Sequence, residues 1–349
     1  MRTNRIRIPR WFDRHLHLRG EDLLETVLPC TLRQKPIGAV VMPNLLDPIT
    51  SFEKAMAYRK KINALIPEDS DFSPCMTLYL TDETKPEDVV TGFKSGLWQA
   101  VKLYMADKNG QGGTTGSHQA VRDLHGRYKV FEVMEKHGIP LLGHFEAVEK
   151  EVDEFDREVV SMARDLQPLL RSFPGLNVVV EHVTDGRMAE FVAKVDHPIF
   201  ATVTAHHLMI NRNSMFWEGM NPLHYCKPVP KREVHRKKVR EYVTSGNPRF
   251  GAGTDSAPHD EKFKTRCCGC AAGIFTAEIA VEMYTTAFDE DDGMEYFGAF
   301  LSENFLGIYG MKVSSELMTV ERTPMQIPKK IGNIRVFNGG ATLPWKLVT

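Results

Sequence analysis

The sequence lacks a membrane-length apolar run, a tandem repeat and a low-complexity tract. Its apolar runs are all shorter than the roughly 18 residues that a membrane-spanning helix needs. An excess of one charge is also missing, because 44 Lys and Arg face 45 Asp and Glu, which gives a formal net charge of −1. Such a chain has no overall field to attract nucleic acid or an anionic membrane. We therefore expect a small-molecule substrate, with no nucleic-acid partner and no membrane partner.

Cysteine is scarce, with six residues in all: Cys30, Cys75, Cys226, Cys267, Cys268 and Cys270. No secretory signal precedes them, so we expect reduced thiols in a cytoplasmic protein. The basic first ten residues faintly resemble a transit peptide, but the motif that begins at Asp13 leaves no room for a removable leader. The cysteine cluster at 267–270 has no second pair at finger spacing, so we expect no structural zinc there.

Eight short apolar runs, several rich in β-branched residues, alternate with helical patterns and predict buried parallel strands. The runs cover 9–15, 37–44, 75–80, 100–104, 141–145, 178–182, 199–204 and 250–255. The helical patterns cover 51–65, 86–94, 120–136, 155–173, 186–195, 231–244 and 271–286. This order predicts a (β/α)8 TIM barrel, with a doubly wound open sheet as the alternative.

The placement of polar side chains favours the barrel. Nearly every predicted strand ends in a residue capable of chemistry, in the order His15 and His17, Asn44, Lys102, His144, His182, Thr204 and Asp255. A barrel brings the carboxyl ends of all its strands to one mouth, whereas an open sheet spreads them along an edge. We expect one domain over 1–349, with a barrel core of about 9–290 and a C-terminal extension of about 291–349 packed on it.

His15 and His17 would point to the same face of an extended strand, because they are two residues apart. Alone, such a pair is as readily explained as two surface histidines on an edge strand. His144, His182 and Asp255 add three further ligands of the kind that Zn²⁺ binds, with Mn²⁺ and Co²⁺ as alternatives. Five ligands suggest two metal ions, provided that another group bridges them.

Lys102 is the candidate bridge, because it lies inside an apolar strand where a charged ammonium is costly. A neutral amine there can add CO₂ and form a carbamate, whose two oxygens could each hold one ion. Two alternatives remain open at this point. The side chain could extend from the strand end to solvent, or it could form a Schiff base, although the latter explains none of the histidines.

Taken together in this order, these motifs resemble the amidohydrolase superfamily and, in closer detail, the bacterial dihydroorotase family. The resemblance runs from about residue 9 to 275. The matching stretches are Asp13–Arg19, Val41–Asn44, Val101–Tyr104, Pro140–His144, Val180–His182, Ala205–Leu208, Asn211–Asn213, Gly253–His259 and Cys268–Ala271.

The resemblance implies two Zn²⁺ per subunit, bridged by hydroxide and by Lys102 as N6-carboxylysine. His15, His17 and Asp255 would bind the more buried ion, and His144 and His182 the second. Asp255 would also be catalytic, moving a proton from the attacking hydroxide to the leaving amide nitrogen. His206 and His207 are adjacent, so at most one should face the mouth, and we expect supporting roles for them.

The resemblance further implies substrate contacts from Arg19, Asn44 and His259, from the backbone around Ala271, and from Lys227, which replaces a usual leucine. Arg19 suits a carboxylate because its guanidinium donates two parallel hydrogen bonds. Simpler explanations are a surface ion pair for Arg19, a turn position for Asn44 and a loop position for His259. Thr114 and Thr115, in a glycine-rich stretch that could equally be a plain solvent loop, match a substrate-covering lid.

The implied activity is the reversible conversion of N-carbamoyl-L-aspartate to L-dihydroorotate and water in pyrimidine synthesis, by a homodimer. A hydantoinase or allantoinase is the alternative within the superfamily, and a non-catalytic barrel used for assembly is the alternative outside catalysis. The sequence departs from the family pattern at Gly20, Met105 and Lys227 and in a longer lid loop, but it keeps every implied ligand.

Overall fold

The structure is a computed structural model that describes residues 4–107, 119–266 and 268–348. Its central sheet holds eight parallel strands in chain order. They are β2 (Phe12–Leu16), β3 (Gly38–Val41), β4 (Ser73–Tyr79), β5 (Ala100–Leu103), β6 (Leu141–Gly143), β7 (Val178–Val180), β8 (Ile199–Val203) and β9 (Phe250–Ala252). A parallel bridge between Leu16 and Ser256 joins the first strand to the segment after the last. The predicted (β/α)8 barrel and its eight strands are therefore confirmed.

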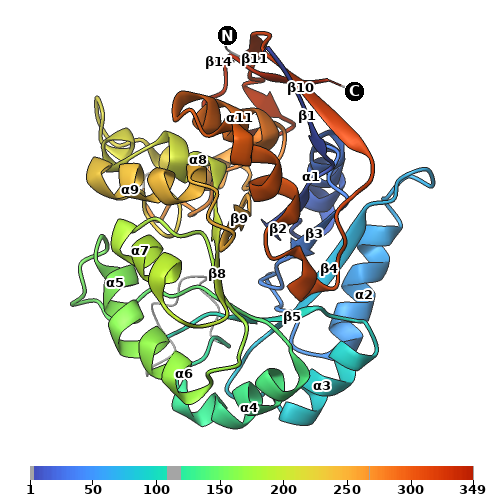
Figure 1. Ribbon diagram of the computed structural model, residues 1–349, viewed down its shortest axis with the longest axis vertical. Coiled ribbons are helices and arrows are strands. Elements are labelled where there is room, and N and C mark those ends of the chain that lie inside the picture. The colour runs from blue at the N-terminus through green and yellow to red at the C-terminus, as the bar shows by residue number, and fades with distance from the viewer. Residues whose placement is uncertain (1–3, 108–118, 267, 349) are drawn as a thin grey trace.

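Helices surround the strands (Figure 1). They are α1 (Glu21–Arg33), α2 (Phe52–Asn63), α3 (Pro86–Lys94), α4 (Tyr128–His137), α5 (Arg157–Ser161), α6 (Gln167–Ser172), α7 (Gly186–Lys194), α8 (Ala205–Met209), α9 (Glu233–Thr244), α10 (Glu261–Lys264) and α11 (Ala280–Glu290). Short 3₁₀ or π segments are η1 (His125–Arg127), η2 (Met162–Leu166), η3 (Arg212–Met215), η4 (Pro222–His224), η5 (Met294–Tyr296), η6 (Ala299–Glu303) and η7 (Leu306–Tyr309). No helix in the described ranges is both long and apolar enough to cross a membrane.

Three helix predictions need correction. Helix α1 was not predicted, because Pro29 lies inside it and interrupts the helical pattern. The helix expected over 120–136 begins only at η1 and α4, and the one expected over 271–286 begins at Ala280. Residues before Ala280 instead run beside neighbouring chain segments, with bridges from Ile274 to Ser256 and from Phe275 to Val336. Tertiary pairing has overridden local propensity there.

The two ends of the chain meet at one end of the molecule (Figure 1). Strand β1 (Arg5–Pro9) pairs antiparallel with β10 (Leu317–Glu321), and β10 pairs with β15 (Lys346–Val348). Two small ribbons complete the extension, β11 (Met325–Gln326) with β14 (Thr342–Leu343) and β12 (Lys330–Ile331) with β13 (Ile334–Arg335). The extension contacts α11 through Leu347, whose backbone N–H donates to Glu282. The single-domain organisation stays a prediction.

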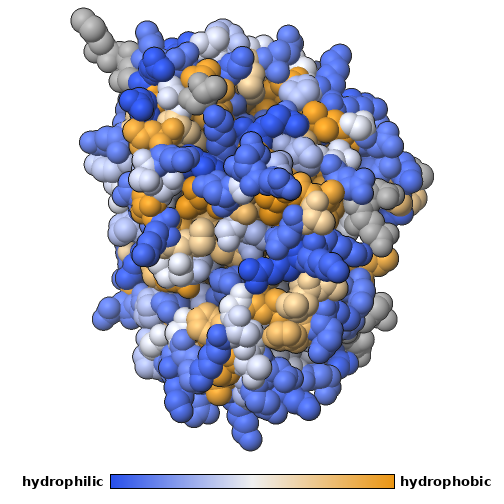
Figure 2. Space-filling model, turned by 90° about the vertical axis from the view of Figure 1, so that its right-hand side faces the viewer, coloured by the Kyte–Doolittle hydropathy of each residue, from blue (hydrophilic) through white to orange (hydrophobic). Residues whose placement is uncertain are grey.

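The surface alternates between hydrophilic residues and separated apolar patches on the face shown in Figure 2. Large apolar side chains are exposed at scattered places, among them Leu46, Met56, Trp217 and Met220. Single exposed apolar residues are normal for a folded protein and need no special function.

Asp13 joins the first barrel strand to the last. Its side chain is only 1% exposed. One carboxylate oxygen accepts from the backbone N–H groups of His15 (3.1 Å) and Thr254 (2.9 Å), and the other accepts from the Thr254 hydroxyl (2.6 Å). Burial raises the pKa of Asp13 to about 7, although these hydrogen bonds oppose the rise. The contacts fix the ends of β2 and β9 relative to each other.

Replacing Thr254 by Val should therefore weaken barrel closure, because the hydroxyl donor to Asp13 is lost while the side-chain shape is kept. A hydrogen bond to a carboxylate contributes about 2 kcal/mol, so the free energy of unfolding should fall by about that amount. Urea unfolding followed by circular dichroism, with a chelator present to remove any metal contribution, measures it. Thr265→Val is the control, because that hydroxyl donates on an exposed helix surface. Equal stability of Thr254→Val and the unmodified chain would contradict a role of the Asp13–Thr254 hydrogen bond in closing the barrel.

Candidate metal and substrate site

Most of the predicted site residues lie together at the carboxyl ends of the barrel strands. They surround a narrow cavity of about 60 Å³. Its walls are formed by His15, His17, Arg19, Asn44, Tyr104, His144, His182, Lys227, Asp255, Ala257, Ala272 and Gly273. A TIM barrel concentrates its catalytic groups at this end, because eight strand ends and their loops converge there.

Three potential ligand atoms cluster at the junction of β2 and β9. His15 Nε2 lies 3.2 Å from His17 Nε2 and 3.3 Å from Asp255 Oδ1. His17 Nε2 lies 2.9 Å from the same Asp255 oxygen. The backbone holds the group together, because the N–H of Asp255 donates to the carbonyl of His15 at 2.8 Å. Ligands of a tetrahedral zinc ion are separated by about 3.4 Å, since each lies about 2.0–2.1 Å from the metal.

His144 and His182 extend this cluster along the mouth. Their ring centroids are 4.4 Å apart, and those of His15 and His182 are 5.1 Å apart. One ligand atom from each of His15, His182 and Asp255 lies within 4.8 Å of the others. The predicted ligands from four different strand ends are thus brought into one group.

Burial keeps these groups in the protonation states that suit metal binding. It lowers the pKa of His15 to about 3 and that of His17 to about 4, and the positive charge of Arg19 lowers the pKa of His17 further. Burial alone would raise the pKa of Asp255, but contacts with the two histidines hold it well below its ordinary value. Neutral imidazoles and an ionised carboxylate are the forms that bind metal ions.

Lys102 lies on β5 beneath the cluster and is fully buried. Its Nζ has no hydrogen-bond partner among the described residues. The nearest carboxylate oxygen belongs to Glu181, 3.5 Å away, and the Tyr104 ring centroid lies 4.9 Å away. Burial lowers the pKa of Lys102 well below its ordinary value, which favours the neutral amine. The alternative in which this side chain reaches solvent is therefore wrong.

Three site residues have left-handed backbones, which side chains other than glycine rarely adopt. Their φ angles are 60° at Arg19, 43° at His182 and 44° at Asp255. Each follows closely on the end of a barrel strand, and each turns its side chain toward the mouth. Such a conformation costs about 1–3 kcal/mol, and strain of this kind concentrates at functional sites.

Arg19 and His259 lie side by side on the substrate side of the cavity. Arg19 Nη2 is 3.2 Å from His259 Nε2, and Arg19 Nε donates to the carbonyl of Pro258 at 3.2 Å. The same His259 nitrogen lies 2.8 Å from the carbonyl of Ala272. The described contacts of the Arg19 side chain, with Pro258, His17 and His259, therefore all lie on this side of the mouth.

Of the remaining predicted substrate residues, some line this cavity and others do not. Asn44 and Lys227 line the cavity. Lys227 also pairs with Glu154 at 3.4 Å. Ala271 is not among the lining residues, which include its neighbours Ala272 and Gly273 instead, and its carbonyl accepts from Lys264 at 3.0 Å. Thr114 and Thr115 fall outside the described residues.

Sequence reasoning missed two buried glutamates at this site, Glu146 and Glu181. Glu181 precedes His182, and Glu146 follows His144 by two residues, so their spacing to the predicted ligands was the available signal. Glu146 Oε2 lies 2.7 Å from His144 Nε2, and Glu181 contacts His15 Nδ1. Both side chains are about 1–2% exposed, so neither is a solvated surface carboxylate.

A second buried group, formed by His206, His207 and Cys226, has ligand atoms close enough for a metal ion. Its hydrogen bonds argue against one. His207 Nε2 faces the carbonyl of Pro228 at 3.0 Å, so it must carry the proton, and Nδ1 accepts from the Thr204 hydroxyl at 2.7 Å. A protonated nitrogen cannot bind metal, and His207 instead supports the loop behind Lys227.

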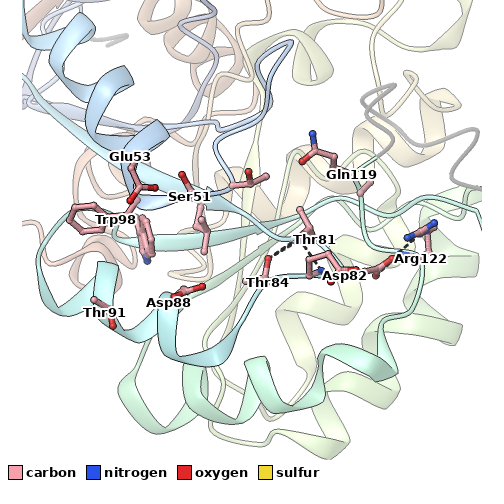
Figure 3. A pocket seen from close by; sticks show the side chains of 15 residues that line it. Ser51, Glu53, Thr81, Asp82, Thr84, Asp88, Thr91, Trp98, Gln119 and Arg122 are labelled. Atoms are coloured by element: carbon pink, nitrogen blue, oxygen red, sulfur yellow. Dashed lines mark hydrogen bonds and ion pairs between the residues drawn. The ribbon is translucent and has the colours of Figure 1, made fainter.

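A separate cavity of about 520 Å³ lies beside the N-terminal ends of α2 and α3, among the segments that follow β3, β4 and β5 (Figure 3). Its polar side chains bond one another, as the Thr81–Thr84 and Asp82–Arg122 pairs show. None of the predicted site residues lines it. The chemistry therefore belongs to the narrower cavity at the mouth.

Comparison with known proteins gives a consistent result, although no protein-family model matches the chain. A dihydroorotase of Sphingopyxis alaskensis is 44% identical, covering 99% of this chain and 100% of that protein. The solved dihydroorotase of Campylobacter jejuni is 30% identical with a TM-score of 0.87, covering 100% of this chain and 99% of its own. The Saccharomyces cerevisiae dihydroorotase, solved with 5-fluoroorotic acid, is 28% identical with a TM-score of 0.89, covering 99% of each chain.

Solved hydantoinases share only 13–15% identity with this chain, which shows a common fold and no more. The dihydroorotases are far closer and match along the whole length. Their family consists of metal-dependent hydrolases, and the His and Asp groups at the mouth are able to bind metal. The chain therefore belongs to the dihydroorotase family of the amidohydrolase superfamily and is a cyclic amidohydrolase of pyrimidine biosynthesis.

Proposed function

We propose that this chain interconverts N-carbamoyl-L-aspartate and L-dihydroorotate plus water at a centre of two Zn²⁺ ions. One observation carries the proposal: neutral imidazoles and an ionised carboxylate converge around a buried lysine that has no hydrogen-bond partner among the described residues. The names of the relatives, and the 5-fluoroorotic acid in the yeast relative's structure, point to the same substrate class.

The residues at the mouth fit two ions better than one. His15, His17 and Asp255 would hold the more buried ion, and His144 and His182 the second. When bound, such ions acidify water and polarise a carbonyl group. The donor set, nitrogen with few oxygens, is the one that zinc prefers.

Lys102 would bridge the two sites as a carbamate. Its neutral Nζ attacks the carbon of CO₂, a C–N bond forms and one proton is released, which leaves an anion with two oxygens. Burial favours this chemistry because it keeps the amine uncharged. It also shields the product from water.

Asp255 would move the proton. It accepts a proton from the water that attacks the ring carbonyl carbon, and it returns that proton to the amide nitrogen as the C–N bond breaks. In the direction of synthesis the same steps run backwards: the nitrogen attacks the carboxyl carbon, and water leaves.

Arg19, Asn44 and His259 would hold the substrate carboxylate. The guanidinium of Arg19 donates to it, and the Pro258 carbonyl, which accepts from Arg19 Nε, keeps the arginine in place. Lys227 and the backbone near Ala271 would complete the pocket. We propose that Thr114 and Thr115 cover the bound substrate as a lid.

We further propose that the chain acts as a homodimer in the cytoplasm, without nucleic acid. Sedimentation equilibrium of the purified chain should give twice the chain mass of 39.5 kDa. A single chain mass at micromolar concentration would contradict the dimer.

The substrate assignment is tested by assaying ring closure of carbamoyl aspartate beside hydrolysis of dihydroorotate, hydantoin and allantoin. We expect turnover of carbamoyl aspartate and dihydroorotate only, because Arg19, Asn44 and His259 would bind the free carboxylate that both carry. Ultraviolet absorbance of the ring follows each reaction. Turnover of hydantoin or allantoin alone would favour the other members of the superfamily.

Replacing Lys102 by Met, which keeps an unbranched side chain one atom shorter and loses the amine, should remove the bridge while largely preserving packing. We expect bound zinc to fall below two ions per chain and activity to fall at least about 1,000-fold, since metal polarisation and the bound nucleophile are both lost. Lys102→Ala leaves room for a short carboxylic acid, and added acetate should restore part of both. Full activity of Lys102→Met would refute the carbamate.

Replacing Arg19 by Met should lower kcat/KM about 10- to 100-fold, because charge-assisted hydrogen bonds contribute about 1.5–3 kcal/mol each. Zinc content should stay at the level of the unmodified chain. Arg33→Met is the matched control, since Arg33 pairs with Glu278 outside the site. A loss of zinc in Arg19→Met, or unchanged kcat/KM, would remove Arg19 from substrate binding.

A further inference from the structure

Two buried glutamates, Glu181 and Glu146, each contact one histidine of the metal cluster. Neither belongs to the predicted ligand set. Their positions along the chain differ, and so do the ring nitrogens that they contact, which makes them two independent examples of one arrangement.

Glu181 follows β7 and points into the barrel beneath the cluster. Its Oε2 contacts His15 Nδ1, the nitrogen that faces away from Asp255. The opposite nitrogen, His15 Nε2, is the atom that lies 3.3 Å from Asp255 Oδ1. A carboxylate can only accept, so the proton of a neutral His15 ring belongs on Nδ1 and the lone pair on Nε2.

The same glutamate lies 3.5 Å from Lys102 Nζ. A carbamate at Lys102 would keep one N–H, and the Glu181 carboxylate is near enough to accept from it. Glu181 is therefore placed to orient two groups at once, the His15 ring and the bridging carbamate. Its side chain is fully buried, as is that of Lys102, so no solvent competes for these contacts.

Glu146 has the complementary geometry. Its Oε2 lies 2.7 Å from His144 Nε2, so the proton of a neutral His144 ring belongs on Nε2 and the lone pair on Nδ1. Lys231 lies beside the other carboxylate oxygen of Glu146. Its Nζ is 4.0 Å from Glu146 Oε1 and 3.2 Å from Glu158 Oε2. Lys231 is itself buried, so this arrangement is a built feature of the interior.

We infer that Glu181 and Glu146 are positioning residues, each accepting the ring N–H of one histidine so that His15 presents Nε2 and His144 presents Nδ1 to metal. The inference rests on the proposed two-metal centre and adds an asymmetry to it. The two histidines use different nitrogens, and each ion depends on a different glutamate. Carboxylates behind metal-binding histidines commonly raise metal affinity in this way.

The test compares zinc affinity in Glu181→Gln, Glu146→Gln and the unmodified full-length chain, by competition with a chelator. Loss of such a partner lowers metal affinity about 10- to 100-fold, so each variant should keep one strong site and weaken the other. Glu181→Gln should be the more affected, because the charge of Glu181 also lies 3.5 Å from Lys102 Nζ. Glu282→Gln is the matched control: Glu282 is equally buried, but it accepts from Leu347 on the outer side of the barrel.

A second measurement does not depend on the two glutamate variants. In the zinc-loaded full-length chain labelled with ¹⁵N-histidine, the proton that remains on each ring can be located by its nitrogen shift, with signals assigned by single histidine substitutions. We expect His15 to keep its proton on Nδ1 and His144 to keep its proton on Nε2.

Three outcomes would overturn the inference: protons on the opposite nitrogens, unchanged zinc affinity at both sites in both variants, or an equal loss in Glu282→Gln. Fewer than two zinc ions in the unmodified chain would instead contradict the proposed two-metal centre. The failures of the two proposals are thus distinguishable.

Discussion

Closure of the barrel between β2 and β9 is the constraint on which the site depends. The first and last barrel strands are far apart in sequence, since Asp13 and Thr254 are separated by 241 residues, yet these two residues and the His15–Asp255 backbone bond hold the strand ends together. That closure places His15, His17 and Asp255 within hydrogen-bond distance of one another. A slip of one residue would turn one strand's side chains to the opposite face. Asp13, which had no expected role, therefore determines the geometry of the cluster.

Burial then decides the chemistry of the groups so assembled. Neutral imidazoles and a neutral amine follow from removing water around His15, His17 and Lys102. Burying so many polar groups without partners is costly. The proposed metal ions would supply the missing partners. The arrangement that serves function at the mouth therefore lowers the free energy of unfolding, as the strained backbones of His182 and Asp255 also indicate.

Much of the fold was predictable, because parallel strands buried on both faces are continuous apolar runs that can be recognised locally. All eight barrel strands were predicted, while helix α1 was missed because of Pro29 and the segment before Ala280 was assigned to a helix. The first error has a local cause, and the second concerns a segment whose conformation depends on contacts with distant parts of the chain. Glu146 and Glu181 were missed because spacing to His144 and His182 was the available signal, and spacing does not show whether a glutamate is buried.

The sequence by itself determined the order of strands and the residue at each strand end, because apolar periodicity and residue type are local properties. It also carried the family resemblance that the relatives bear out. Only the tertiary structure decided that Lys102 is fully enclosed, that Asp13 closes the barrel, and which nitrogen of each histidine faces a carboxylate. These properties depend on which residues from distant parts of the chain come into contact. Those contacts form only when the barrel closes.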